Sequence, residues 1–107
     1  MSEKDDKKGG TDVLDRDEAK EKIKKPRKYK VILLNDDFTP MDFVVQVLKQ
    51  VFHMSSAAAT RVMLNIHNQG AGVAGIYSRE IAETKAAQVM AVAQSEGHPL
   101  QSTIEPE

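Results

Sequence analysis

The first candidates for ligand binding or catalysis in this sequence are Asn35, Asp36 and Asp37, which are consecutive. Two adjacent carboxylates can attract a hard cation or an ammonium group, but Mg²⁺ and Ca²⁺ normally require more oxygen ligands than this short run offers. Asn and Asp side chains also close turns by accepting hydrogen bonds from their own backbone. The residue types alone therefore favour a structural role in a turn over ligand binding.

His67 is the second candidate. It follows Met63 by four positions, so both side chains would project from one face of a helix. Histidine is a common ligand-binding residue, but it also bonds carbonyl groups at helix ends, and the sequence leaves both roles open. His53 and His98 are not spaced as a pair of metal ligands on one helix.

Glu80, Glu83 and Lys85 form a third polar group, and such charges usually belong to the solvated face of a helix. The sequence has no cysteine, which excludes a thiolate zinc site and a cysteine nucleophile. No serine lies in a nucleophile elbow, and no glycine run matches a phosphate-binding loop. We therefore expect no enzyme activity and no cofactor.

The composition indicates one small domain. The chain has 107 residues, of which 40% are hydrophobic, and no run approaches the roughly 18 apolar residues that a membrane span needs. No apolar segment near Met1 resembles a secretory signal. We expect a cytoplasmic protein that contacts no membrane, with a monomer as the default state.

Charge is distributed unevenly along the chain. Residues 1–28 hold ten of the 15 basic and eight of the 16 acidic residues, so the remainder carries a net charge of −3. Residues 1–25 are too poor in apolar side chains to offset the entropy of ordering, and we predict a disordered, mixed-charge tail. We expect no nucleic-acid partner, because the folded part would repel a polyanion.

Six elements should position the candidate residues. Apolar periodicity and turn residues predict a strand at 29–34, a helix at about 40–52 capped by Thr39, a helix from Ser55 to Gly70, a strand at 71–77, a helix from Ser78 to Gly97 and a strand at about 99–104. The order β-α-α-β-α-β predicts an α+β domain, with three helices packed on one face of a three-stranded antiparallel sheet. The run 35–37 would then follow the first strand directly.

Several segments together resemble the ClpS adaptor family. They are Tyr-Lys-Val-Ile-Leu-Leu-Asn-Asp-Asp-Phe-Thr-Pro-Met (29–41), Met-Leu-Asn-Ile-His (63–67), Gln-Gly (69–70), Glu-Ile-Ala-Glu-Thr-Lys (80–85) and His-Pro-Leu (98–100). The match spans essentially residues 26–105, and we take 26–107 as the adaptor domain. Ala74 stands where many members carry Cys, and Phe38 stands where Tyr is frequent.

The resemblance implies an adaptor that binds the free amino terminus of proteins starting with Leu, Phe, Tyr or Trp, known as N-degrons. It would deliver them to the ClpA unfoldase, which feeds the ClpP protease. The implied site residues are Asn35, Asp36 and His67 for the α-amino group; Thr39, Met41, Val44, Met63 and Leu100 for the side-chain pocket; and Glu80, Thr84 and Lys85 for the N-terminal domain of ClpA.

Simple chemistry is consistent with this role. An α-ammonium group offers three N–H donors and a positive charge, which an amide carbonyl, a carboxylate and a neutral imidazole can accept. The charge-assisted bond to Asp36 would be the strongest of these. Flexible methionines in an apolar pocket would tolerate several first side chains.

Two hypotheses from other functional classes remain alternatives. The first is a small metal-dependent hydrolase that uses Asp36, Asp37 and His67. The second is a scaffolding domain that docks one partner through the third helix. On that helix we expect Glu80 and Lys85 to lie on the exposed side, because the residues Ala82, Ala86 and Val89 form its apolar stripe.

Overall fold

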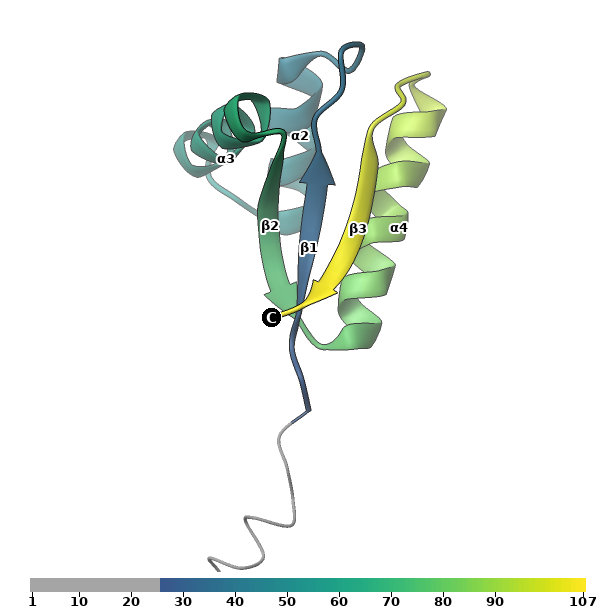
Figure 1. Ribbon diagram of the computed structural model, residues 1–107. Helices are drawn as coiled ribbons and strands as arrows, with labels where there is room; N and C mark the ends of the chain where they lie inside the picture. Colours follow the sequence, from purple (N-terminus) through teal and green to yellow (C-terminus); the bar gives the residue numbers. More distant parts are fainter. Residues whose placement is uncertain (1–25) are drawn as a thin grey trace, which may run out of the picture.

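The computed structural model describes residues 26–107, so the tail predicted for residues 1–25 lies outside the described residues. In chain order the elements are β1 (Tyr29–Leu34), α2 (Met41–Phe52), α3 (Ser56–Gln69), β2 (Ala71–Tyr77), α4 (Arg79–Ser95) and β3 (Gln101–Pro106) (Figure 1). This order confirms the predicted β-α-α-β-α-β arrangement.

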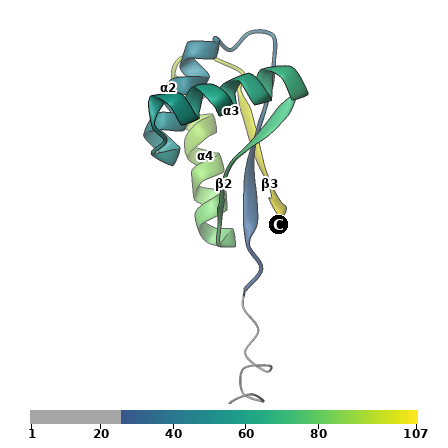
Figure 2. The ribbon, with the colours of Figure 1, turned by 90° about the vertical axis from the view of Figure 1, so that its left-hand side faces the viewer.

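The three strands form one antiparallel sheet with β1 in the centre and the order β2-β1-β3. Its two faces differ in burial. Val31 and Leu33 of β1 are fully buried on one face, whereas Leu34 points to the other and is exposed. Figure 2 shows α2 and α4 on one side of the sheet, and α3 crossing from α2 to the start of β2. Buried residues of all three helices join Val31 and Leu33 in one core, so the predicted packing of the helices on one face is correct.

Each helix contributes an apolar stripe to the core under the sheet. From α2 the buried residues are Val44, Val47, Leu48 and Phe52; from α3 they are Ala59, Met63 and Ile66; and from α4 they are Ala82, Ala86, Val89 and Ala93. The stripe predicted for α4, Ala82, Ala86 and Val89, is among them.

The start of α2 differs from the prediction. Pro40 is the N-cap and the helix begins at Met41, one residue later than expected. Thr39 does not cap the helix, because its hydroxyl donates to Asp36 instead, at 2.8 Å. Ser55 caps α3 as predicted, with its hydroxyl accepting from the Ala58 N–H at 3.2 Å. Ser78 occupies the N-cap position of α4 without a side-chain cap bond.

The last strand is displaced by two residues from its predicted position. It runs from Gln101 to Pro106 and not from 99 to 104, because β1 pairs Leu34 with Gln101 and Tyr29 with Pro106. Pro99 has no N–H to donate to a sheet. Every second residue faces the core, since Leu100 and Ser102 are buried and Ile104 is half-buried.

Candidate functional site

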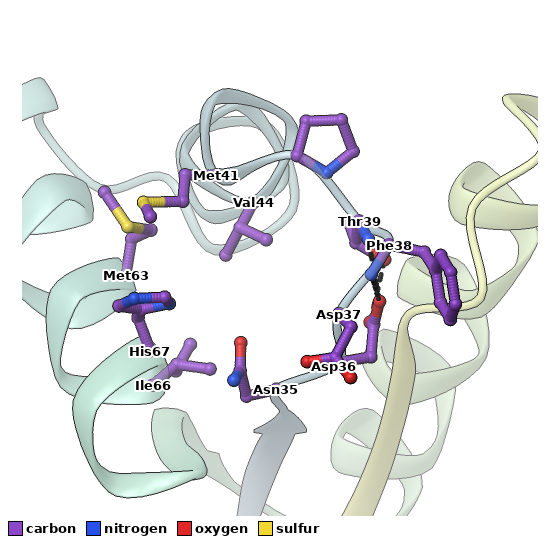
Figure 3. Close-up of a pocket in the computed structure, with 11 residues that line it drawn as sticks. Asn35, Asp36, Asp37, Phe38, Thr39, Met41, Val44, Met63, Ile66 and His67 are labelled. Carbon is purple, nitrogen blue, oxygen red and sulfur yellow. Dashed lines mark hydrogen bonds between the residues drawn. The ribbon is translucent and has the colours of Figure 1, made fainter.

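Two segments far apart in the sequence enclose a pocket of about 350 Å³ at one end of the sheet. The first is the loop after β1 together with the first turn of α2, and the second is the C-terminal half of α3 (Figure 3). The lining residues are Asn35, Asp36, Asp37, Phe38, Thr39, Pro40, Met41, Val44, Met63, Ile66 and His67. Seven of the eight residues that the resemblance implies for ligand binding are among them.

Backbone contacts explain why α3 meets the end of β1. The Asn35 N–H donates to the Gly70 carbonyl at 2.9 Å, which ties the strand end to the residue that ends α3. Gly72 allows α3 to lie close to the sheet, because a Cβ there would come within 2.6 Å of Ile66 Cγ1. Together these contacts bring Met63 and His67 opposite the loop that follows β1.

The loop itself is held by Asp36. Its Oδ1 accepts hydrogen bonds from the backbone N–H groups of Phe38 (2.8 Å) and Thr39 (2.7 Å), and its Oδ2 accepts from the Thr39 hydroxyl. This is the turn-closing role that the residue types favour. Asp36 therefore builds the rim of the pocket and has only part of its carboxylate left for a ligand.

Opposing influences set the ionisation of Asp36. Burial raises the pKa of its carboxyl, but the hydrogen bonds from Thr39 and Phe38 and the positive charge of His98 outweigh burial and hold the pKa below its ordinary value. The carboxylate is therefore ionised at neutral pH. The same hydrogen bonds favour the ionised form, so they stabilise the turn more strongly while Asp36 carries its charge.

The mouth of the pocket is polar. Figure 3 shows Asn35 pointing into the space between α2 and α3, with His67 on one side and the two aspartates on the other. Asn35, Asp37 and His67 are all exposed. Gly70, and not His67, ends α3, because the Gly70 N–H donates to the Ile66 carbonyl. An amide oxygen, a carboxylate and an imidazole nitrogen thus surround one opening, and all three can accept hydrogen bonds.

The walls behind the mouth are apolar. Val44, Met63 and Ile66 are buried, and Met41 is 46% exposed at the entrance. Ile66 was not among the pocket residues that the resemblance implies. Its position three residues after Met63 and directly before His67 is the pattern that could have placed it in the wall as well.

Leu100 lies apart from the other predicted pocket residues. It is 2% exposed and does not line the main pocket. It lines a small neighbouring cavity whose other walls are Leu34, Asn35, Asp36, Thr39, Val44 and Ile66. Leu100 therefore supports the pocket from behind.

The residues implied for a partner interface on α4 divide into two kinds. Glu80 and Thr84 are exposed, but Lys85 is half-buried, which corrects the expectation that it lies on the exposed side of the helix. Its Nζ donates to the Val51 carbonyl at 2.7 Å and lies over the rings of Phe52 and Tyr77. The buried stripe of α4 was predicted correctly. Lys85 lies at the edge of that stripe, and its long side chain reaches a carbonyl at the end of another helix.

We predict that Lys85→Ala lowers the free energy of unfolding by about 1–2 kcal/mol, because it removes a charged hydrogen bond at the C-terminus of α2 and two cation–π contacts. Urea denaturation measures the change. The control, Glu80→Ala on the exposed side of α4, should stay within about 0.5 kcal/mol of the wild type. Equal stability of both variants would show that the Lys85 contacts contribute nothing.

Residues 26–107 contain no group of three or more His, Asp or Glu side chains placed to hold a metal ion. Asp36, Asp37 and His67, weighed above as a hydrolase site, line one pocket without forming such a group. Within the same described part of the chain, no helix is long and apolar enough to cross a membrane.

The chain is similar in sequence to known adaptor proteins of a protease. A family model described as "ATP-dependent Clp protease adaptor protein ClpS" matches residues 24–103. The ATP-dependent Clp protease adapter protein ClpS of Deinococcus radiodurans is 56% identical over 99 residues, which cover 92% of this chain and 84% of that protein. Its counterpart from Paraburkholderia xenovorans is 52% identical over 100 residues, which cover 94% and 93%.

A solved structure shares the fold. The structure of Agrobacterium tumefaciens ClpS2 bound to L-phenylalaninamide matches with a TM-score of 0.76 and 48% sequence identity. The match covers 78% of this chain and 100% of that one.

Proposed function

Because the chain belongs to the ClpS family of Clp protease adaptor proteins, we propose that its pocket binds the free amino terminus of proteins that begin with Leu, Phe, Tyr or Trp. The observation that carries the proposal is a pocket with a mouth of hydrogen-bond acceptors and walls of apolar side chains. A related structure bound to L-phenylalaninamide supports it, since that ligand has a free α-amino group and a bulky apolar side chain.

Asn35, His67 and the two aspartates bind the α-ammonium group in this proposal. Asn35 and His67 accept two of its N–H bonds across the mouth. The aspartates supply the countercharge, but their shares differ. Asp36 has both oxygens engaged in the turn, whereas Asp37 is exposed at the same rim, so Asp37 has the carboxylate that can turn fully to the ligand.

The apolar walls select the first side chain. Met41, Val44, Met63 and Ile66 surround a space of the size that one large side chain fills, and the thioethers adapt to aliphatic or aromatic shapes. A small or charged first residue would leave the walls in contact with water or place a charge against them. No bond is made or broken, so the chain acts by recognition alone.

The direct test is fluorescence anisotropy with labelled decapeptides that differ only in the first residue. Peptides starting with Leu, Phe, Tyr or Trp are expected to bind at least tenfold more tightly than those starting with Ser or Asp, since a large apolar side chain fully buried contributes about 1.5–3 kcal/mol. Equal affinity for all six peptides would contradict the proposal. A peptide with Leu in the second position and Ser in the first serves as the matched control.

Met41 limits which apolar residues enter, because it lies at the entrance in the first turn of α2. We predict that Met41→Ala gives peptides starting with Ile or Val about tenfold higher affinity by making room for the second γ branch, while Leu changes little. Affinities of the variant for the three peptides, measured by anisotropy, check this. Continued rejection of Ile and Val would show that Met41 is not the gate.

Delivery to the ClpA unfoldase of the ClpAP protease is part of the proposal, with Glu80 and Thr84 on α4 as exposed contacts to the N-terminal domain of ClpA. Lys85 joins them only with the part of its side chain that the Val51 carbonyl leaves accessible. The complex would form in the cytoplasm, with one adaptor chain as a monomer.

We predict that Glu80→Lys weakens binding to the isolated ClpA N-terminal domain by about tenfold while peptide affinity stays unchanged, because charges at the rim of an interface fix approach and register. Biolayer interferometry measures the first quantity and anisotropy the second. Glu96→Lys makes the same charge change at the other end of α4 and should leave both unchanged. Loss of peptide binding in folded Glu80→Lys would show that Glu80 contributes to peptide binding, and would contradict its assignment to a separate ClpA interface.

A further inference from the structure

The connection between α4 and β3 lies against the back of the pocket. Gly97 has a φ of +77°, a conformation that favours glycine, and it ends α4 with two backbone bonds. The Gly97 N–H donates to the Gln94 carbonyl at 3.0 Å, and the His98 N–H donates to the Ala93 carbonyl at 2.8 Å. This pattern is a Schellman motif, and it fixes the backbone from which the His98 side chain departs.

The imidazole of His98 contacts the first turn of α2. Its ring centroid lies 4.5 Å from that of Phe43, with the rings inclined by 63°, which is edge-to-face packing. Phe43 lies between Met41 and Val44 of the pocket, and its N–H donates to the Pro40 carbonyl at 3.1 Å. A ring that holds Phe43 therefore also holds the turn that carries both of these wall residues.

The same connection approaches the loop after β1. The charge of His98 is one of the influences that hold the pKa of Asp36 below its ordinary value. Two residues further on, Leu100 is buried in the cavity behind Asn35 and Thr39. His98 and Leu100 thus support neighbouring parts of the pocket, although neither lines it.

We propose that His98 is a positioning residue for peptide binding: its ring holds Phe43, and through it the first turn of α2, in the orientation that shapes the pocket. The proposal rests on the proposed function, because it concerns affinity for a peptide with a free amino terminus. The contribution comes from the aromatic contact, so a ring without a proton to titrate should replace it.

The test measures affinity for a labelled Leu-initiated peptide and its N-acetylated twin, together with urea denaturation of each variant. His98→Ala is expected to weaken binding of the free peptide by about threefold to tenfold, the size of edge-to-face aromatic contacts. His98→Phe should restore most of the affinity. The control is Gln94→Ala, an exposed change on the last turns of α4, which should bind like the wild type.

Phe43→Leu removes the other ring of the same aromatic contact and should weaken peptide binding to a similar extent. In the double variant with His98→Ala the two effects should not add, since both remove the same contact. If His98→Ala fails to fold, Phe43→Leu and His98→Phe decide the question, because the first should lose affinity and the second keep it.

A spectroscopic measurement tests whether His98 is near the turn. The amide signals of Phe38 and Thr39, which donate to Asp36, report the acid titration of that carboxyl. Both His98→Ala and His98→Phe should raise the titration midpoint of Asp36, since both remove the charge that helps to lower its pKa.

Three results would overturn the inference. Wild-type affinity in folded His98→Ala, while the wild type still discriminates against the acetylated peptide, would overturn it and leave the proposed function standing. Equal loss in His98→Ala and His98→Phe would show that the aromatic contact is not what matters. A wild type that binds both peptides equally would overturn the proposed function and the inference with it.

Discussion

Acetylation of the peptide's amino group is expected to weaken binding by at least about 30-fold, or roughly 2 kcal/mol. The acetyl group removes the positive charge and two of the three N–H donors, so Asn35 and His67 lose bonds and the aspartates lose their countercharge. The mouth of the pocket is partly exposed, so water compensates some of this loss, and the estimate is at the low end for charged hydrogen bonds.

The measurement is competition against a labelled Leu-initiated peptide by its free and acetylated forms. A control pair starting with Ser shows how much acetylation alone changes weak binding. Acetylated and free Leu peptides of equal affinity would contradict recognition of the amino terminus. That result would mean that the pocket binds apolar side chains at any position of a peptide.

Replacement of the two aspartates one at a time is expected to separate ligand binding from support of the loop. Asp37→Ala should weaken peptide binding by about tenfold without changing stability, because it removes an exposed charge at the rim where we propose that the amino group binds. Asp36→Ala should weaken binding by a similar or larger factor and also lower the free energy of unfolding by about 1–2 kcal/mol, because the turn loses three hydrogen bonds.

Anisotropy and urea denaturation on the two variants give both quantities. Unchanged affinity in Asp37→Ala, with loss only in Asp36→Ala, would assign the countercharge to Asp36. Unchanged stability in Asp36→Ala would mean that its hydrogen bonds do not hold the loop.

The contribution of Asp36 to stability should depend on pH. Its pKa is lower in the folded protein than its ordinary value of 3.8, so its stabilising effect is complete above that value and is lost as the pH falls through the folded value. The stability difference between the wild type and Asp36→Ala should therefore be constant from neutral pH to about pH 5 and should shrink in more acidic solution. A difference that stays the same at pH 3 would show that the charge is irrelevant to the turn.

The sequence was sufficient to predict the fold because local signals agree with it. The β-branched run before Asn35, the helical spacing in α2 and the glycine after α3 each mark an element correctly. The errors lie at element ends that side-chain competition decides. Thr39 could cap a helix or bond Asp36, and only the folded loop shows that it bonds Asp36. Sheet pairing likewise carries β3 to Pro106, beyond its predicted end.

The residues that line this pocket could largely be predicted, but their separate roles could not. Asn35 and His67 line one pocket, as the resemblance implies, and their binding of an amino group stays a prediction. The residue types favoured a turn-closing role for the run 35–37, but they could not tell which of the two aspartates takes it, or that Lys85 reaches the end of α2. Both facts depend on where long-range packing leaves an acceptor or donor, which residue types and spacing do not specify.

Titration of ¹⁵N-labelled protein with a Leu-initiated peptide, followed at every backbone amide by NMR, shows directly where the peptide binds. We predict that the largest shifts occur at residues 35–44 and 63–67, and that the N-acetylated peptide at the same concentration produces almost none. Shifts centred elsewhere, such as on the exposed face of β2 around Val73 and Ile76, or equal shifts with both peptides, would contradict the assignment of this pocket as the site for free amino termini.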